Sequence, residues 1–359
     1  MTMTMTMSPN LNNLNLAVLA STLFFAVGLS LPFARNIFAP HATDSGESRR
    51  RLTNDPSRLN VPSGVDWNEE YHINDRGMAL YSQSFRPNNQ EPKGLMLLCH
   101  GYAETSLWYF RDIAMDWVKE GYACVALDYE GHGKSDGLHA YIPDFDKMVD
   151  DVAVFHEKVA ARPENAGLPR FLYGESMGGA VAIELSLRRP QLYQGMVLQA
   201  PMCKISEKVK PPAPIIGALR GLARIFPERA WTPSPDVQKN AYSDPAELRA
   251  ARRYTFAYTR KVRLGTAIQM ISFSEGLEGR LGRVRLPFLL LHGGADRVTD
   301  PGVSRALHEA AASEDKTFKL YDGLWHKLLC EPPEMKKQVW EDITAWVNKR
   351  ASKEGIKSS

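Results

Sequence analysis

The stretch Arg170-Phe-Leu-Tyr-Gly-Glu-Ser-Met-Gly-Gly-Ala-Val-Ala-Ile-Glu-Leu185 decides the fold. Its first part, Phe171 to Tyr173, is bulky and apolar, as is typical of a short buried strand. Its last part, from Ala180 to Leu187, has the residue types and the apolar spacing of a helix. Between them lies a G-x-S-x-G motif centred on Ser176. At a sharp strand-to-helix turn this motif exposes the serine hydroxyl, and the helix N-terminus behind it favours a developing oxyanion. Ser176 is therefore the predicted nucleophile.

A second stretch, Gly133-Lys-Ser-Asp-Gly137, matches the same pattern. It runs into residues 138–143, whose proline and mixed polarity do not open a helix. We therefore interpret it as a loop after a strand, and Ser135 as the less suitable candidate. The alternative for Ser176 is a serine that only caps the following helix.

Composition limits the class of protein. The chain has 359 residues, of which 44% are hydrophobic and 24% charged, with a net charge of +3. These values are typical of an ordinary globular enzyme with one large domain or two small ones, and they imply no general role in nucleic-acid binding. The four cysteines are widely separated and have no metal-ligand spacing, so free thiols are expected, and neither a metal nor an organic cofactor is indicated.

The N-terminal residues differ from the rest of the chain. Residues 1–41 contain no acid and one base, and Leu16 to Phe33 is an uncharged run of 18 residues. This length is just sufficient to span a bilayer, and the arginines that follow it favour a signal-anchor with the catalytic domain in the cytosol. Cleaved secretory or organelle targeting is the alternative. Residues 42–65 are expected to form a linker, and residues 351–359 a tail.

From Gly77 onward, apolar runs alternate with amphipathic patterns. Such alternation predicts an α/β fold with a mostly parallel central sheet and helices on both faces. The core is expected to comprise residues 66–202 and 286–350. Strands are predicted at 78–85, 94–99, 123–127, 171–173, 195–200, 287–292 and 317–321, and helices at 109–119, 144–161, 180–187 and 334–348.

The alternation stops between the two parts of the core. Residues 203–285 contain helical patterns, such as 215–226 and 245–258, and are predicted to form a cap over Ser176, inserted before the strand that leads to Asp296. The cap segment carries 16 Lys and Arg against 7 Asp and Glu, a net charge of +9. This excess is either a solvated basic surface or a face that attracts anionic lipid headgroups or acidic substrates.

A serine nucleophile needs a base and an orienting carboxylate. His326 follows the last predicted strand, and Asp296 follows the strand before it. The order Ser176, Asp296, His326 is that of an α/β-hydrolase. Asp300, which resembles a helix cap, and Asp322, which lies too near His326, compete less well with Asp296.

Two further predictions concern the loops around the nucleophile. His100 and His292 each end a strand before a glycine, and we expect them to orient loops by hydrogen bonds. The backbone N–H groups of Tyr102 and Met177 are the expected donors to the oxyanion.

Five motifs occur in order and resemble the monoacylglycerol lipase group of α/β-hydrolases, most closely its plant-type branch, which includes caffeoylshikimate esterases. They are His100-Gly-Tyr-Ala-Glu-Thr105, Asp128-Tyr-Glu-Gly-His-Gly-Lys-Ser-Asp-Gly-Leu-His139, Gly174-Glu-Ser-Met-Gly-Gly179, Ala200-Pro-Met-Cys-Lys204 and Leu291-His-Gly-Gly-Ala-Asp-Arg-Val-Thr-Asp-Pro301.

The resemblance covers about residues 66–348 and implies the same triad and the same two oxyanion amides. Two positions depart from the family's pattern. Ala103 stands where the family generally has Gly, and Glu130 stands where it usually has an apolar residue or Pro.

The leading hypothesis is a serine hydrolase that cleaves carboxylic esters, with monoacylglycerol or a lysolipid as substrate and a membrane surface as a partner. A hydroxycinnamoyl esterase is the first alternative. An acyltransferase is suggested only by His139-x-x-x-x-Asp144, a pairing expected by chance. An aminopeptidase would need carboxylates in the cap, and a non-catalytic receptor would not need a triad.

Overall fold

Eight strands form one sheet in the computed structural model, which describes residues 46–52, 61–204 and 212–352. The strand order is β1-β2-β4-β3-β5-β6-β7-β8. β1 and β2 are antiparallel to each other, and β2 is antiparallel to β4, whereas all the other neighbours are parallel. The strands are β1 (Val65–Ile73), β2 (Ala79–Pro87), β3 (Leu95–Cys99), β4 (Ala123–Leu127), β5 (Arg170–Glu175), β6 (Gly195–Gln199), β7 (Phe288–Gly293) and β8 (Lys316–Tyr321).

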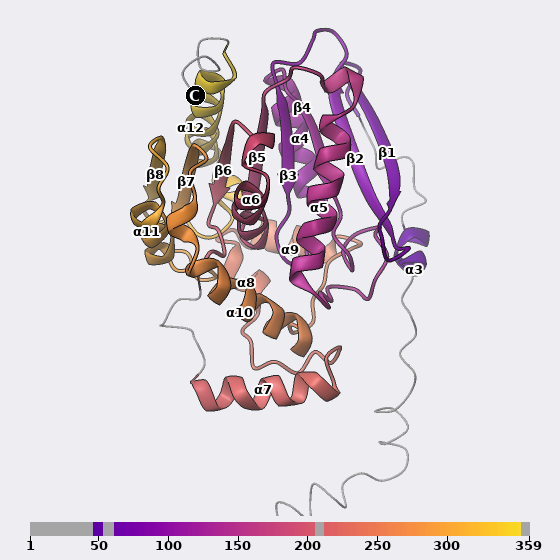
Figure 1. The fold of residues 1–359 in the computed structure, drawn as a ribbon, viewed down its shortest axis with the longest axis vertical. Helices are drawn as coiled ribbons and strands as arrows, with labels where there is room; N and C mark the ends of the chain where they lie inside the picture. The colour runs from indigo at the N-terminus through magenta and orange to yellow at the C-terminus, as the bar shows by residue number, and fades with distance from the viewer. Residues whose placement is uncertain (1–45, 53–60, 205–211, 353–359) are drawn as a thin grey trace, which may run out of the picture. The chain divides into compact units, whose positions relative to one another are not determined.

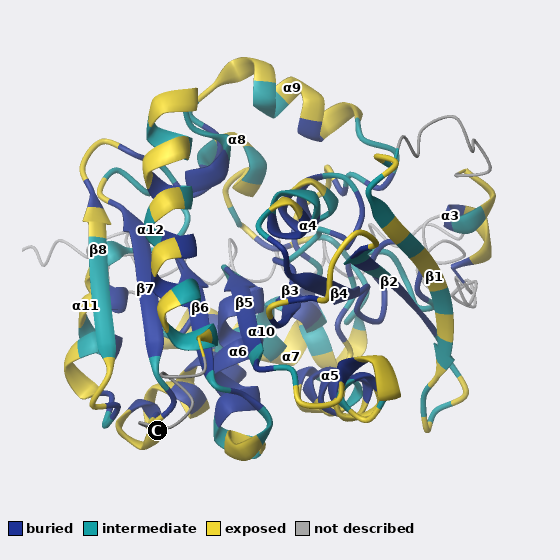
Figure 2. Ribbon diagram, turned by 90° about the horizontal axis from the view of Figure 1, so that it is seen from above, coloured by how far each residue is buried: buried dark blue, intermediate teal, exposed yellow. Residues whose placement is uncertain are grey.

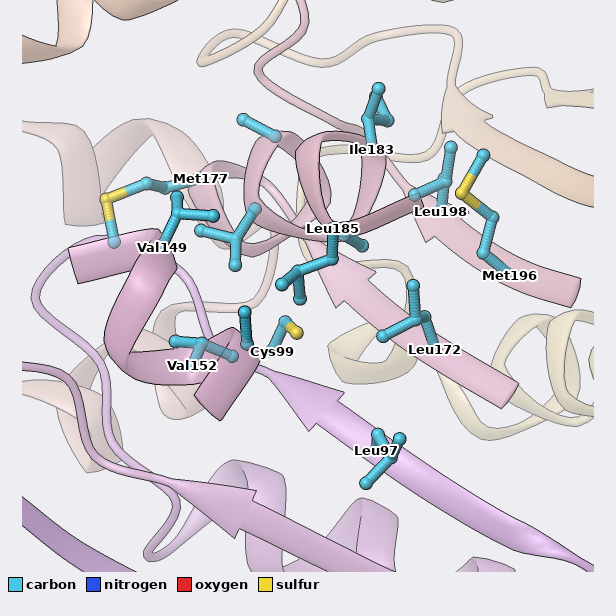
Figure 3. Close-up of a cluster of buried hydrophobic side chains, with 14 of the residues drawn as sticks. Leu97, Cys99, Val149, Val152, Leu172, Met177, Ile183, Leu185, Met196 and Leu198 are labelled. Carbon is cyan, nitrogen blue, oxygen red and sulfur yellow. The ribbon is translucent and has the colours of Figure 1, made fainter. Parts of the chain in front are cut away.

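The central strands are continuous apolar runs because helices cover both faces of the sheet (Figure 2). One face carries α5 (Phe145–Ala160), α6 (Met177–Arg188) and α11 (Pro301–Ala310), and the other carries α4 (Tyr109–Lys119) and α12 (Pro333–Ala351). Each face has its own cluster of buried side chains. Figure 3 shows part of the first cluster, where side chains of α5 and α6 meet those of β3, β5 and β6. The predicted α/β-hydrolase architecture is confirmed.

Between β6 and β7 the chain forms α7 (Ala213–Ile225), α8 (Val237–Ala241), α9 (Pro245–Arg253) and α10 (Leu264–Glu278). Figure 1 shows α10 and α7 beyond one end of the sheet, with α7 outermost. α10 is attached to the core, since Phe273 stacks on Phe145 of α5 with ring centroids 4.0 Å apart. α9 ends five residues before the predicted helix did, because Tyr254 is extended and stacks on Trp108 at 5.4 Å.

The expected linker over 42–65 contains structure that the sequence did not indicate. Residues Glu47–Arg51 form the short helix α3, and Arg49 is buried. The Arg49 guanidinium donates to the carbonyl oxygens of Gly133, Ser135 and Gly137 at 2.9, 2.6 and 2.8 Å. A polar segment rich in arginine has no apolar periodicity, so the sequence does not predict this helix. Its position depends on hydrogen bonds to carbonyl groups far along the chain.

The proposed anchor, Leu16 to Phe33, lies outside the described residues. Within the described ranges, none of the helices has the length and the apolar character needed to cross a membrane.

Candidate active site

Ser176 sits on a strained turn between β5 and α6. Its backbone has φ 55° and ψ −119°, a conformation that L-residues rarely adopt. Hydrogen bonds from the Ser176 backbone tie the turn to neighbouring segments: its N–H donates to the Gln199 carbonyl at 2.9 Å, and its carbonyl accepts from the Met202 N–H at 2.8 Å. The motif therefore forms the sharp strand-to-helix turn that the sequence predicts.

The two glycines of the motif are required by close backbone contacts. A Cβ on Gly174 would lie 2.4 Å from the carbonyl oxygen of Gly178. A Cβ on Gly178 would lie only 2.0 Å from the carbonyl oxygen of Cys99, at the end of β3. α6 can therefore begin against the sheet only because these positions lack side chains.

His326 and Asp296 form a hydrogen-bonded pair. The distance from His326 Nδ1 to Asp296 Oδ2 is 2.7 Å, and both side chains are buried. Because the carboxylate only accepts, the neutral form of the imidazole carries its hydrogen on Nδ1 and has its lone pair on Nε2. Burial by itself would raise the pKa of Asp296, but the neighbouring His326 and His292 hold that pKa well below its usual range.

The Asp296 carboxylate is fixed by its own loop. Its Oδ1 accepts from the N–H groups of Val298 and Thr299 at 2.7 and 3.1 Å, and its Oδ2 accepts from the Thr299 hydroxyl at 2.9 Å. His292 Nε2 lies 3.1 Å from the same Oδ2. The predicted loop-orienting role of His292 is correct, but its contact with Asp296 was not foreseen in the sequence.

Ser176 and His326, 150 positions apart in the chain, line the same cavity of about 540 Å³. The rest of its wall comes from the loop after β3, the start of α4 and the segment with α8 and α9. Aromatic and apolar lining residues include Tyr102, Leu107, Trp108, Tyr242, Tyr254, Tyr258 and Val262. Three predicted residues are thus brought together, with Ser176 and His326 at the cavity wall and Asp296 behind the histidine.

The two amides expected to bind an oxyanion lie beside Ser176 in the chain and in the loop after β3. The Met177 side chain is fully buried in the core beside α5 (Figure 3), so only its backbone can act at the turn. Among the described residues, neither the Met177 nor the Tyr102 N–H has a backbone acceptor. Ala103 has φ 60°, the left-handed conformation that favours glycine, and so adopts the backbone expected of the residue it replaces.

The competing candidates have structural roles. Ser135 is buried, accepts from the Tyr81 N–H at 2.8 Å and donates to the Asp128 carbonyl at 2.5 Å. His100 contacts the Gly101 carbonyl at 2.8 Å, as predicted for a loop-orienting residue. Asp300 caps α11 through the Gly302 N–H at 2.9 Å.

The residues of the acyltransferase-like pairing also serve the fold. Asp144 caps α5 by accepting from the Lys147 N–H at 3.1 Å. His139 contacts the Phe256 carbonyl at 3.2 Å, and neither side chain lines the cavity of Ser176. The spacing therefore has no catalytic counterpart in the structure. Glu130 pairs with Arg76 at 2.9 Å, which accounts for a carboxylate at this buried position.

Sequence reasoning missed a buried charged cluster next to Ser176. The Lys327 ammonium contacts the carboxylates of Glu104 and Glu175, and the Tyr109 hydroxyl donates to Glu175 at 2.7 Å. Burial raises the pKa of Glu175 to about 8 and lowers that of Lys327 to about 7. Nothing in the sequence marks a lysine after a histidine as buried. Within the described ranges, no cluster of three or more His, Cys, Asp or Glu side chains could hold a metal ion.

A family model and curated relatives both match most of this chain. The family model described as serine aminopeptidase, S33, matches residues 90–333. Caffeoylshikimate esterase of Arabidopsis thaliana is 34% identical, over 82% of this chain and 90% of that protein. Human monoglyceride lipase is 30% identical, over 86% of this chain and 99% of that protein.

Solved structures show the same fold. The monoacylglycerol lipase of Paleococcus ferrophilus is 25% identical with a TM-score of 0.65, over 76% of this chain and 99% of that one. A soluble variant of the Saccharomyces cerevisiae monoglyceride lipase has a TM-score of 0.69 at 21% identity, over 79% of this chain and 95% of that one. The chain therefore belongs to the serine aminopeptidase S33 family of α/β-hydrolases and is a serine hydrolase of the esterase and lipase kind.

Proposed function

We propose that this enzyme hydrolyses monoacylglycerols or lysolipids, with Ser176 as nucleophile, His326 as base and Asp296 as the group that orients the base. The observation that carries this proposal is that Ser176 lines one cavity with His326, and that His326 Nδ1 is hydrogen-bonded to Asp296 behind it. His326 Nε2 takes the Ser176 proton as the hydroxyl attacks the ester carbonyl. Asp296 stabilises the imidazolium that forms.

The negative charge on the carbonyl oxygen is received by the N–H groups of Met177 and Tyr102. His326 then gives its proton to the departing alcohol, which leaves an acyl group on Ser176 Oγ. A water molecule, deprotonated by His326, attacks the acyl carbon and releases the fatty acid. The same five groups serve both half-reactions.

The cavity walls support an apolar acyl group. A smaller apolar cavity of about 190 Å³ shares Ser234 and Val262 with the first and continues along α10, where Met270 and Ile271 line it. The smaller cavity thus offers further apolar lining next to the cavity that contains Ser176.

An aminopeptidase reaction has less support. A substrate ammonium would need an unpaired carboxylate in the cavity, but Asp236 contacts Arg252 and Glu104 contacts Lys327. Both carboxylates that line the cavity are therefore already paired with a cation.

The aromatic lining favours a second candidate, a hydroxycinnamoyl ester. Trp108 and Tyr254 stack at 5.4 Å, and Tyr102 lies edge-on to Tyr258 at 6.4 Å, so flat aromatic acyl groups have partners in the same cavity. The relative from Arabidopsis thaliana is named for such an ester.

Substrate profiling of the purified enzyme tests the two candidates. Hydrolysis of monooleoylglycerol, oleoyl-lysophosphatidylcholine and a caffeoyl ester should be compared by kcat/KM, with Ser176→Ala as the background control. The lipid proposal expects the two lipids to exceed the caffeoyl ester by at least about tenfold. A caffeoyl ester cleaved faster than both lipids would replace it with the second candidate, and turnover of none would reject both.

We also propose that the enzyme acts at a membrane surface, held by a signal-anchor at Leu16 to Phe33 with its catalytic domain in the cytosol. α7 supports this, because Ile215, Leu222 and Ile225 are exposed on it, and Trp231 is exposed shortly after it. Basic residues Arg252, Arg253, Arg260 and Lys261 are exposed in the same inserted segment.

A protein lacking residues 1–43 tests the surface contribution separately, since the remainder is a compact unit. It should bind vesicles of anionic phospholipid and release them as salt rises. Reversing the four basic charges should abolish this binding. Because Arg252, Arg260 and Lys261 also line the cavity, p-nitrophenyl acetate turnover of the same variant should be measured to separate vesicle binding from catalysis. Absence of binding at low salt would leave only the N-terminal segment as a membrane contact.

A further inference from the structure

Three loops of the active site meet at one buried ammonium group. Lys327 directly follows His326, Glu175 directly precedes Ser176, and Glu104 lies two residues after Tyr102. The Lys327 Nζ contacts Oε1 of both carboxylates. The side chains of Lys327 and Glu175 are 4% and 0% exposed, and that of Glu104 is 21% exposed. One side chain thus joins the base loop, the nucleophile elbow and the loop of the second oxyanion donor.

Glu104 links Lys327 to the backbone of the loop that contains Tyr102. Its second oxygen, Oε2, accepts from the Gly101 N–H at 3.0 Å. The Glu104 N–H in turn donates to the Gly101 carbonyl at 3.3 Å, which closes a tight turn around Tyr102 and Ala103. Because Ala103 holds an unfavourable positive φ, this turn needs outside contacts to keep its shape. The Glu104 carboxylate supplies one, and Lys327 fixes the carboxylate.

Glu175, the member of the cluster next to Ser176, is also fixed by several contacts. Glu175 Oε2 accepts from the Tyr109 hydroxyl at 2.7 Å and also contacts the Gln199 amide. The Lys327 ammonium lies 4.4 Å from the centroid of the Tyr109 ring, within the range of a cation–π contact. The ammonium therefore has partners on β5, α4 and the loop after β3, and its position is determined by all of them.

A contribution to folding stability does not by itself explain why a lysine and two glutamates are buried together here. Removing charges from water costs free energy, and a buried ion pair is often no more stabilising than apolar side chains of similar volume. A buried charged triad is better accounted for by the geometry that it imposes. Burial raises the pKa of Glu175 and lowers that of Lys327, so it disfavours the charge on each, and the hydrogen bond from the Tyr109 hydroxyl opposes the rise at Glu175.

We propose that Lys327 is a positioning residue, which through Glu104 and Glu175 sets the oxyanion loop relative to Ser176 and His326. This inference rests on the proposed roles of Ser176 and of the Tyr102 N–H. Oxyanion contacts strengthen in the transition state, so an error in their position lowers kcat more than it raises KM.

Kinetics of Lys327→Met on p-nitrophenyl butyrate test the proposal. Methionine keeps the length of the side chain and removes the charge. Loss of one oxyanion donor costs about 10²–10³ in kcat, so a displaced donor should cost at least about tenfold, with KM changed by less than about threefold. The rate at which a fluorophosphonate labels Ser176 should fall with kcat, because its phosphoryl oxygen uses the same donors.

Lys327→Met leaves two carboxylates without their cation and so can also destabilise the protein. The double variant Lys327→Met/Glu175→Gln removes one of those charges. Its thermal midpoint should recover towards that of the native enzyme while kcat stays low. Glu104→Gln, at the more accessible end of the cluster, should lower kcat with a small change in thermal midpoint.

Arg76→Met is the matched control. Arg76 is likewise a cation held by two carboxylates, Asp151 at 2.6 Å and Glu130 at 2.9 Å, and none of the three lines the cavity. It should lower the thermal midpoint and leave kcat unchanged. The proposal is overturned if Lys327→Met and Glu104→Gln keep native kcat, or if the double variant regains kcat together with stability. Residual turnover by Ser176→Ala would instead overturn the proposed function.

Discussion

The orientation of Asp296 is fixed both by its own loop and by a residue from a distant part of the chain. Asp296 receives two backbone N–H groups and one hydroxyl from its own loop, in addition to His326. The carboxylate therefore cannot rotate away when the histidine moves or becomes charged. Its depressed pKa favours the ionised carboxylate. The sequence indicated Asp296 by its place after a strand, but not this set of donors.

Asp296→Asn should lower kcat by about 10³–10⁴-fold. An amide can donate to His326 Nδ1, which places the ring hydrogen on Nε2 and removes the lone pair that accepts the Ser176 proton. The thermal midpoint and the kcat on p-nitrophenyl butyrate should be measured together. A folded variant with more than a tenth of the native kcat would exclude Asp296 as the orienting group.

At the scale of whole elements, short-range sterics decide how α6 begins. The elbow could be predicted from sequence because its glycines are demanded by contacts within a few residues and with the adjacent strand. The buried strands β3, β4 and β6 were predictable for a similar reason, since burial on both faces requires continuous apolar runs. β1 is an edge strand whose residues are all partly or fully exposed; Val65, Trp67, Tyr71 and Ile73 alternate with polar residues, but Glu69 interrupts the series, and the strand was missed.

Gly178→Ala should prevent the native packing of α6, because its Cβ would overlap the Cys99 carbonyl oxygen at 2.0 Å. We expect loss of activity and destabilisation of several kcal/mol. Gly276→Ala in α10 is the matched control, since its Cβ meets nothing within 4 Å. That change should stabilise the protein by about 0.5–1 kcal/mol, as measured by urea unfolding. Equal effects of the two substitutions would contradict the steric account.

α3 is an element that tertiary hydrogen bonds determine, which is why the segment looked like a linker. Arg49→Gln removes three hydrogen bonds from a charged donor to buried carbonyls and should cost about 2–3 kcal/mol in urea unfolding. Arg51→Gln, whose side chain is 75% exposed, should cost less than about 0.5 kcal/mol. A neutral result for Arg49→Gln would show that α3 does not contribute to the stability of the folded domain.

At the scale of the whole molecule, three buried histidines make folding sensitive to acid. Burial lowers the pKa of His100 and His156 to about 3, and places that of His132 well below its ordinary value of 6.5. Between pH 6.5 and 3 the unfolded chain binds protons that the folded protein does not. Stability therefore falls as pH falls through this window, by up to about 1.4 kcal/mol per pH unit for each histidine.

His156→Gln tests this linkage without altering the cavity. His156 Nδ1 contacts the Tyr193 hydroxyl at 3.0 Å, and glutamine can keep a hydrogen bond there. The free energy of unfolding should be measured in urea from pH 6 to 4.5. The slope with pH should be smaller than that of the native protein by about 1.4 kcal/mol per unit. An unchanged slope would show that His156 is not held neutral by the fold.

The central claim is that Ser176, and not the Ser135 of the matching pattern, performs the chemistry. It is tested most directly by steady-state turnover of p-nitrophenyl butyrate by Ser176→Ala and Ser135→Ala, with the folded fraction of each measured by circular dichroism. Ser176→Ala should lose at least about 10³-fold in kcat. Ser135→Ala should lose about 1 kcal/mol of stability through its two hydrogen bonds and keep a native kcat per folded molecule. A comparable loss in both folded variants, or native turnover by Ser176→Ala, would contradict the account.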